Sequence, residues 1–139
     1  MRRVTAFCSA VMLALASPAA LCVEAPEQAA EAAARAWLAL VDSGNYAKSW
    51  SDASTLFRQQ VSQLQWQSAA TRARGPLGAL KSRQFLSAAF TRTLPDAPTG
   101  EYVVIQFTSS FDRKATAVET ITPMKDKDGA WHVSGYFIR

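Results

Sequence analysis

The change of hydrophobic period at residues 74–78 constrains the fold more than any other feature of this chain. Before this point apolar residues recur at helical spacing, and after it they alternate with polar residues, as in half-buried strands. The glycines and proline of Gly75-Pro76-Leu77-Gly78 end the helical part, and a turn explains them better than a phosphate-binding loop. Helices followed by strands predict an α+β fold, with the helices on one face of an antiparallel sheet.

Two or three helices are expected in the first half of the chain. The first is predicted over residues 26–43, where small and aromatic apolar residues fall on one face. Gly44 then provides a left-handed stop, and Asn45 caps a short helix over residues 46–50.

A further start signal precedes residue 55 and predicts one continuous helix over residues 55–72. Its buried stripe is expected to contain Phe57, Val61 and Leu64. Trp66 lies nearly opposite Phe57 on this helical wheel. It is therefore expected either to contact a second layer or to be partly exposed.

Four strands joined by short connections account for the second half. The strongest pattern is in residues 101–111, where Val103, Ile105 and Phe107 face one way and the residues between them face the other. We expect a curved four-stranded antiparallel meander sheet with the helices packed on it. The strands are predicted over residues 81–93, 101–111, 114–124 and 131–138.

Residues 1–20 have the features of a secretory signal peptide. Arg2 and Arg3 precede an apolar stretch over residues 4–16, and small residues follow over residues 17–20. The apolar stretch is shorter than the roughly 20 residues that span a bilayer, which argues against a membrane anchor. The sequence therefore predicts a periplasmic or secreted protein, with no stable membrane insertion after cleavage.

Cleavage leaves a flexible leader over residues 21–28 and a single domain over residues 29–139. Cys22 is then the lone cysteine, because Cys8 belongs to the signal peptide. An incidental thiol is favoured over an intermolecular disulfide or a lipid attachment. A lipoprotein signal needs a small residue just before its cysteine, and Leu21 occupies that place.

Charge argues against nucleic acid as a partner. The chain has 15 Lys and Arg residues against 11 Asp and Glu residues, which gives a net charge of +4. Removal of Arg2 and Arg3 leaves 13 against 11, so the net charge falls to +2. No basic run survives that would follow a phosphate backbone.

The sequence predicts neither a metal site nor a cofactor. His132 is the only histidine, so a histidine-based relay or cluster cannot be built within one chain. No serine lies in a Gly-x-Ser-x-Gly elbow. Residues 126–129 resemble the start of a calcium loop but lack its later ligands, and a hairpin turn explains them fully.

Glu119 is the most interesting acid, because it lies in the middle of a predicted strand. A buried carboxylate there needs a partner such as Arg83, and a structural ion pair is favoured over a catalytic acid. The aromatic residues permit two interpretations: they line a pocket for an apolar ligand or they fill the core, and core packing is the default. The set comprises Trp37, Trp50, Phe57, Trp66, Phe107, Trp131 and Tyr136.

A series of segments carries a resemblance to a known family: residues 36–46, 49–50, 56–58, 76–78, 83, 100–107, 117–120 and 131–136. Through them the chain resembles the domain of unknown function 4019, an uncharacterised secreted bacterial family. The resemblance implies an exported setting and no assigned activity or catalytic residues. The predicted architecture is also similar to nuclear-transport-factor-2-like or cystatin-like rolls, although the hairpin usual between the early helices of the former is missing.

The favoured hypothesis is a non-enzymatic exported binding or interaction module. It binds an unknown protein or an apolar small molecule through the concave face of the sheet, and its oligomeric state stays open. The alternative is a small pocket enzyme of the isomerase or dehydratase type, which uses Glu119 with Tyr102 or His132. An open cavity with Glu119 buried inside it favours the enzyme, and a filled core with an exposed apolar patch favours the interaction module. The candidate ligand-binding residues are Trp66, Tyr102, Glu119 and His132.

Overall fold

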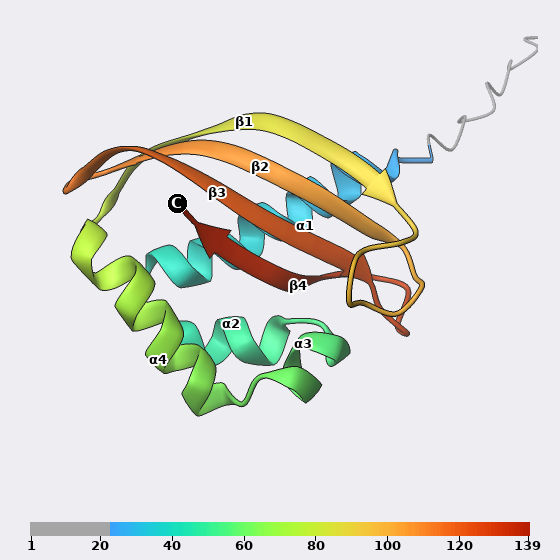
Figure 1. Cartoon of the computed structure of the whole chain (residues 1–139). Helices are drawn as coiled ribbons and strands as arrows, with labels where there is room; N and C mark the ends of the chain where they lie inside the picture. Colours follow the sequence, from blue (N-terminus) through green and yellow to red (C-terminus); the bar gives the residue numbers. More distant parts are fainter. Residues whose placement is uncertain (1–22) are drawn as a thin grey trace, which may run out of the picture.

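The computed structural model describes residues 23–139, which form four helices followed by a four-stranded sheet (Figure 1). This confirms the α+β class and the predicted order of elements. The predicted signal peptide and Cys22 lie outside the described residues. No helix within residues 23–139 is both long and apolar enough to cross a membrane. The elements are α1 (Pro26–Asp42), α2 (Tyr46–Asp52), α3 (Thr55–Gln60), α4 (Gln63–Arg74), the 3-10 turn η1 (Gly75–Leu77), β1 (Leu80–Thr91), β2 (Tyr102–Phe111), β3 (Lys114–Lys125) and β4 (Trp131–Ile138).

The helix α1 crosses the concave face of the sheet and contacts all four strands, whereas α3 contacts β4 and α2 packs against α1 and α4 (Figure 1). The end of α1 and the start of α2 confirm the predicted stop and cap. Gly44 has a φ of 75°, and the Asn45 side chain accepts a hydrogen bond from the Lys48 backbone N–H. The buried residues of α1 are Ala30, Ala34, Trp37, Leu38 and Val41.

The prediction of one helix over residues 55–72 is wrong, because the chain forms two helices that are separated at Val61 and Ser62. Val61 is extended, with a φ of −129°, and its carbonyl accepts a 2.7 Å hydrogen bond from the indole nitrogen of Trp50. Ser62 then begins α4 through a capping box that it shares with Gln65. The break is therefore encoded locally, by a serine followed three residues later by a glutamine.

The break changes which residues of this segment are buried. Phe57 and Trp66 both turn inward, and their rings meet edge to face with centroids 5.4 Å apart. Leu64, which was expected in the buried stripe, is 75% exposed. Two short helices thus bring together side chains that one straight helix would hold on opposite sides.

The sheet is an antiparallel meander in the order β1-β2-β3-β4, as predicted. Val103, Ile105 and Phe107 of β2 are fully buried against the helices, which confirms the predicted inward face. They form one core with Trp37 of α1 and Val133 of β4. The concave face is therefore filled by helices along most of its width.

A bulge in β1 reverses the alternation of side chains along that strand. Phe85 pairs with Phe107 and Ala88 pairs with Ile105, so three steps of β1 oppose two steps of β2. Phe85 and Ala88 consequently face the same side of the sheet although they are an odd number of residues apart. Further register shifts lie near the start of β1, in the pairing of β2 with β3, and in the pairing of β3 with β4.

Candidate functional site

A buried ionic network lies where the C-terminal ends of α1 and α4 meet the sheet. At its centre the carboxylate of Glu119, which has no solvent-exposed surface, accepts hydrogen bonds from four donor atoms. Arg83 donates from Nε to Oε1 at 2.8 Å and from Nη2 to Oε2 at 3.1 Å. Ser109 and Tyr136 donate their hydroxyls, the latter at 2.6 Å. The predicted pairing of Glu119 with Arg83 is confirmed.

The second half of the network surrounds Asp42 at the end of α1. Arg83 reaches both carboxylate oxygens of Asp42, at 2.8 and 2.9 Å, and Arg74 donates to Oδ1 at 2.7 Å. The guanidinium of Arg74 also lies 4.8 Å from the ring centroid of Phe111, and its Nε and Nη1 atoms make no hydrogen bond within the described residues. Two carboxylates and two guanidinium groups thus balance one another in charge.

The protonation states follow from this geometry. Burial on its own raises the pKa of Asp42, but the hydrogen bonds and charges of Arg83 and Arg74 outweigh it and hold that pKa below its ordinary value. Burial and the neighbouring Glu119 carboxylate raise the pKa of Tyr136 far above its ordinary value. Tyr136 therefore stays a neutral hydroxyl that donates to Glu119, and it is not available as a general base.

The four predicted site residues do not form one cluster. Trp66 and Glu119 come close to each other through Tyr136, whose ring centroid is 6.4 Å from that of Trp66. Tyr102 is the first residue of β2, far along that strand from Ser109, which contacts Glu119. It is buried, and its hydroxyl donates a 2.7 Å hydrogen bond to the Pro98 carbonyl. His132 lies near the start of β4 and has separate partners.

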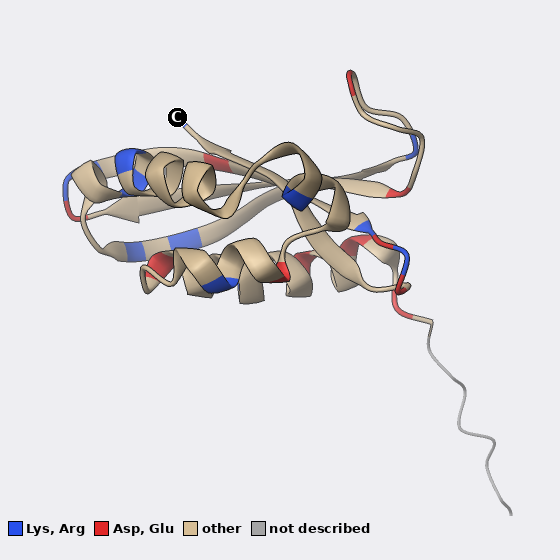
Figure 2. Ribbon diagram, turned by 90° about the horizontal axis from the view of Figure 1, so that it is seen from below, with Lys and Arg blue, Asp and Glu red and all other residues tan. Residues whose placement is uncertain are grey.

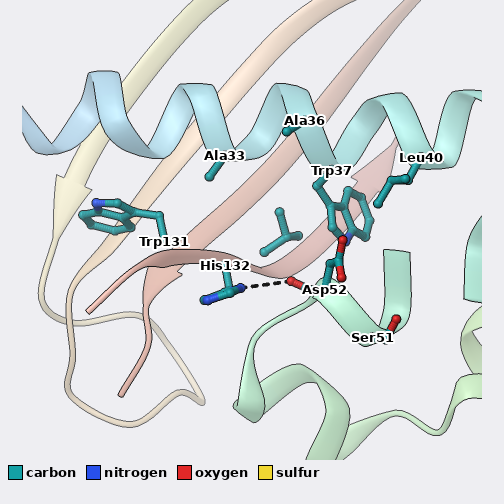
Figure 3. A pocket seen from close by; sticks show the side chains of 9 residues that line it. Ala33, Ala36, Trp37, Leu40, Ser51, Asp52, Trp131 and His132 are labelled. Atoms are coloured by element: carbon teal, nitrogen blue, oxygen red, sulfur yellow. Dashed lines mark hydrogen bonds between the residues drawn. The ribbon is translucent and has the colours of Figure 1, made fainter. Parts of the chain in front are cut away.

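A surface groove of about 420 Å³ lies between α1, α2 and the start of β4 (Figure 3). Trp131 stands at one end, Trp37 and Leu40 stand at the other, and Ala33 and Ala36 of α1 lie between them. The two alanines leave the groove open, because they place only methyl groups where larger side chains would fill it. The remaining lining residues are Ser51, Asp52, His132 and Val133.

His132 joins two walls of this groove. Its Nδ1 is 3.0 Å from the Asp52 carbonyl oxygen at the end of α2, and its Nε2 is 2.7 Å from Oδ2 of Asp128 in the β3–β4 turn. Burial on its own lowers the pKa of His132, but these two acceptors outweigh it and raise the pKa above 6.5. Because both ring nitrogens face acceptors, the geometry is satisfied fully only by the protonated imidazole.

Sequence reasoning found His132 and placed Trp131 among the aromatic residues, but it did not identify Ala33 and Ala36 as parts of a site. Small residues on a helix carry no chemical signal of their own. Within residues 23–139 no group of three or more His, Cys, Asp or Glu side chains is arranged to hold a metal ion.

Comparison with known proteins adds a family to this description. A search of curated proteins gives no match. The family model described as "Protein of unknown function (DUF4019)" matches residues 33–136, which is well over half of the chain and includes all the residues that line the groove and the whole ionic network. The chain therefore belongs to this family of proteins of unknown function.

Proposed function

We propose that the protein is a non-enzymatic exported binding module, which takes an uncharged, mostly apolar small molecule into the groove between α1, α2 and β4. The observation that carries the proposal is the lining of the groove, where the half-buried indole of Trp131 and the small side chains of Ala33 and Ala36 border an apolar floor. The buried side chains of Trp37 and Val133 form part of that floor. Its volume of about 420 Å³ lies within the range of roughly 300–1,000 Å³ typical of small-molecule sites.

The charges around the groove favour an uncharged ligand. The carboxylate of Asp52 is paired with Lys48 at 2.6 Å, and His132 is paired with Asp128. Over the rest of the surface, Lys and Arg positions are interspersed with Asp and Glu positions (Figure 2). No charge at the groove is therefore left without a partner for a charged ligand to neutralise.

A small molecule is favoured over a protein partner because the exposed apolar residues are dispersed. A stable protein interface buries about 800 Å² on each partner around a contiguous apolar centre. The large exposed apolar side chains beyond the N-terminal Val23 are Leu64 on α4, Phe85 and Leu86 on β1, and Phe137 on β4. No residue of α4 or β1 lines the groove, and Phe137 lies at the opposite end of β4 from Trp131 and His132.

The alternative of an isomerase or dehydratase has less support. Both oxygens of Glu119 are occupied by Arg83, Ser109 and Tyr136. Glu119 has no solvent-exposed surface and does not line the groove, so a ligand in the groove does not contact this carboxylate. The proposal that the protein is exported rests on residues 1–20. Their charged, apolar and small-residue regions follow one another in the order typical of a secretory signal peptide.

Binding of the uncharged fluorescent probe N-phenyl-1-naphthylamine tests the proposal. We expect saturable binding by the wild type, and affinity at least about tenfold lower in Ala36→Trp, where the indole fills the groove. Ala36 is exposed, so this variant is expected to keep its fold. The matched control is Ala89→Trp, at an exposed position on β1 outside the groove, and it should bind like the wild type. Equal affinities for Ala36→Trp and the wild type, or no saturable binding at all, would contradict the proposal.

A further inference from the structure

The β3–β4 turn and the α2–α3 junction are tied together beneath the groove. Three contacts make this connection. Asp126 Oδ2 accepts a 2.6 Å hydrogen bond from the Thr55 backbone N–H, and the Ser54 N–H donates to the Val133 carbonyl at 2.9 Å. The third is His132, which bridges Asp128 and the Asp52 carbonyl. Of these contacts, only the one through His132 uses a side chain that ordinarily titrates near neutral pH.

Loss of a proton from His132 must break or weaken one half of that bridge. A neutral imidazole has one N–H donor and one acceptor nitrogen. If Nδ1 keeps the proton, the Nε2 lone pair faces the Asp128 carboxylate at 2.7 Å; if Nε2 keeps it, the Nδ1 lone pair faces the Asp52 carbonyl at 3.0 Å. The Asp128 carboxylate is a stronger acceptor than a backbone carbonyl, so the neutral ring keeps its proton on Nε2. The contact that is lost is therefore the one from Nδ1 to the Asp52 carbonyl on α2.

The charged surroundings of His132 favour its protonated form from both sides of the groove. The turn contributes Asp126 and Asp128. The last turn of α2 contributes the Asp52 carbonyl, at the end of the helix where the backbone dipole is negative, and the Asp52 carboxylate is already paired with Lys48. The groove residues of α1 are Ala33, Ala36, Trp37 and Leu40, and none of them titrates.

We propose that protonation of His132 is a latch that holds the α2 wall of the groove against β4, so that the groove retains its ligand less well as pH rises. The inference rests on the proposed function, since it assigns the regulation of that same site. The sign follows from the direction of the shift. Folding raises the pKa of His132 above 6.5, so protonation of this residue stabilises the folded protein. That stabilisation is complete below pH 6.5 and is lost as the pH rises through the pKa of His132 in the folded protein.

The latch is tested first without any ligand. Because His132 is the only histidine, its ring C–H signals are unique in a nuclear magnetic resonance titration. We expect a midpoint above pH 6.5 in the wild type and a lower midpoint in Asp128→Asn, which keeps the histidine and removes the carboxylate. A midpoint at or below pH 6.5 in the wild type overturns the latch, whatever the groove binds.

The coupling to the groove wall is read from the Ser54 amide, which donates to Val133 across the α2–β4 contact. After correction for the intrinsic exchange rate, its protection from hydrogen exchange should fall by roughly threefold to tenfold between pH 6 and pH 9 in the wild type. In His132→Gln, which cannot be protonated, the protection should stay constant. The same pH course in both proteins overturns the coupling.

The affinity for N-phenyl-1-naphthylamine should fall over the same pH range in the wild type and stay level in His132→Gln. A wild-type affinity that does not change with pH overturns control of the groove by the latch. Failure of the probe to bind at any pH counts against the proposed function, while the histidine titration and the Ser54 exchange still decide whether the latch exists.

Discussion

Glu119 shows what a single buried residue contributes in this protein. Its carboxylate is fully buried. Removing a charged group from water costs several kcal/mol of folding free energy, unless an opposite charge and hydrogen-bond donors in the protein offset that cost. Arg83 offsets the cost for two acids at once, because its guanidinium lies between Glu119 and Asp42. Removal of one member therefore leaves the others buried without full compensation.

Glu119→Gln should destabilise the protein by about 3–5 kcal/mol, the range found when one partner of a buried ion pair is removed. The matched control is Glu31→Gln, which breaks the exposed ion pair with Arg35 and should cost less than about 1 kcal/mol. Urea denaturation followed by circular dichroism measures both values. Similar losses in the two variants would show that the buried network contributes no more than a surface pair.

The network was only partly predictable from the sequence. A mid-strand acid indicates that it needs a basic partner, and Arg83 was identified on that ground. Asp42 and Arg74 carry no such indication, because both lie at helix ends where charged residues are ordinarily solvated. They join the network only when the C-terminal ends of α1 and α4 meet and α1 packs against β1, which local patterns do not specify.

At the scale of elements, the irregular positions decide which side chains face the core. The capping box at Ser62 turns one expected helix into two, and the bulge after Phe85 returns Ala88 and Phe90 to the inner face of β1. A prediction that assumes an unbroken helical period of 3.6 residues, or an unbroken strand period of 2, assigns the residues after each irregularity to the wrong face of the helix or strand. Such positions are difficult to predict from one sequence, because a single inserted residue reverses the face of everything that follows.

The connection from η1 to β1 depends on a glycine. Gly78 has a φ of 75°, and a Cβ atom there would lie 2.9 Å from Cβ of Asp112. Gly78→Ala should therefore cost about 1–3 kcal/mol, the usual range for a residue forced into a conformation that favours glycine. Gly135→Ala in β4 is the control, because its φ lies outside the left-handed region and its added methyl group would meet Thr122 at an ordinary contact distance of 3.9 Å.

Gly135→Ala should be neutral or stabilising by up to about 1 kcal/mol, because a glycine inside a strand loses more backbone freedom on folding than an alanine. Thermal unfolding of the two variants beside the wild type measures the difference. If both alanines have the same effect, neither the backbone conformation nor the contact with Asp112 constrains this turn.

At the scale of the whole molecule, the order of layers was predictable and the groove was not. Helices before strands, short connections and alternating residues are local signals, and together they gave the α+β class and the bounds of the strands to within two residues. The similarity to nuclear-transport-factor-2-like or cystatin-like rolls stays a prediction. The groove depends on which faces of α1 and α2 are turned toward β4. Those faces are set by the packing of the helices on the sheet, and no local sequence pattern records it.

The ionic network also has a consequence for the order of events in folding. Arg83 is 41 residues from Asp42 and 36 residues from Glu119, and Tyr136 belongs to the last strand. Contacts between such distant segments form only after the intervening loops have closed, so they are expected late on the folding route. The network then acts mainly as a barrier to unfolding.

In stopped-flow experiments Glu119→Gln should accelerate unfolding and leave the refolding rate nearly unchanged. Refolding slowed by the full loss of equilibrium stability would instead place the network in the transition state. If the protein is exported as proposed, it must persist without the cell's chaperones. The late formation of these contacts between two carboxylates and two guanidinium groups would then set how long the folded protein lasts, and not how fast it forms.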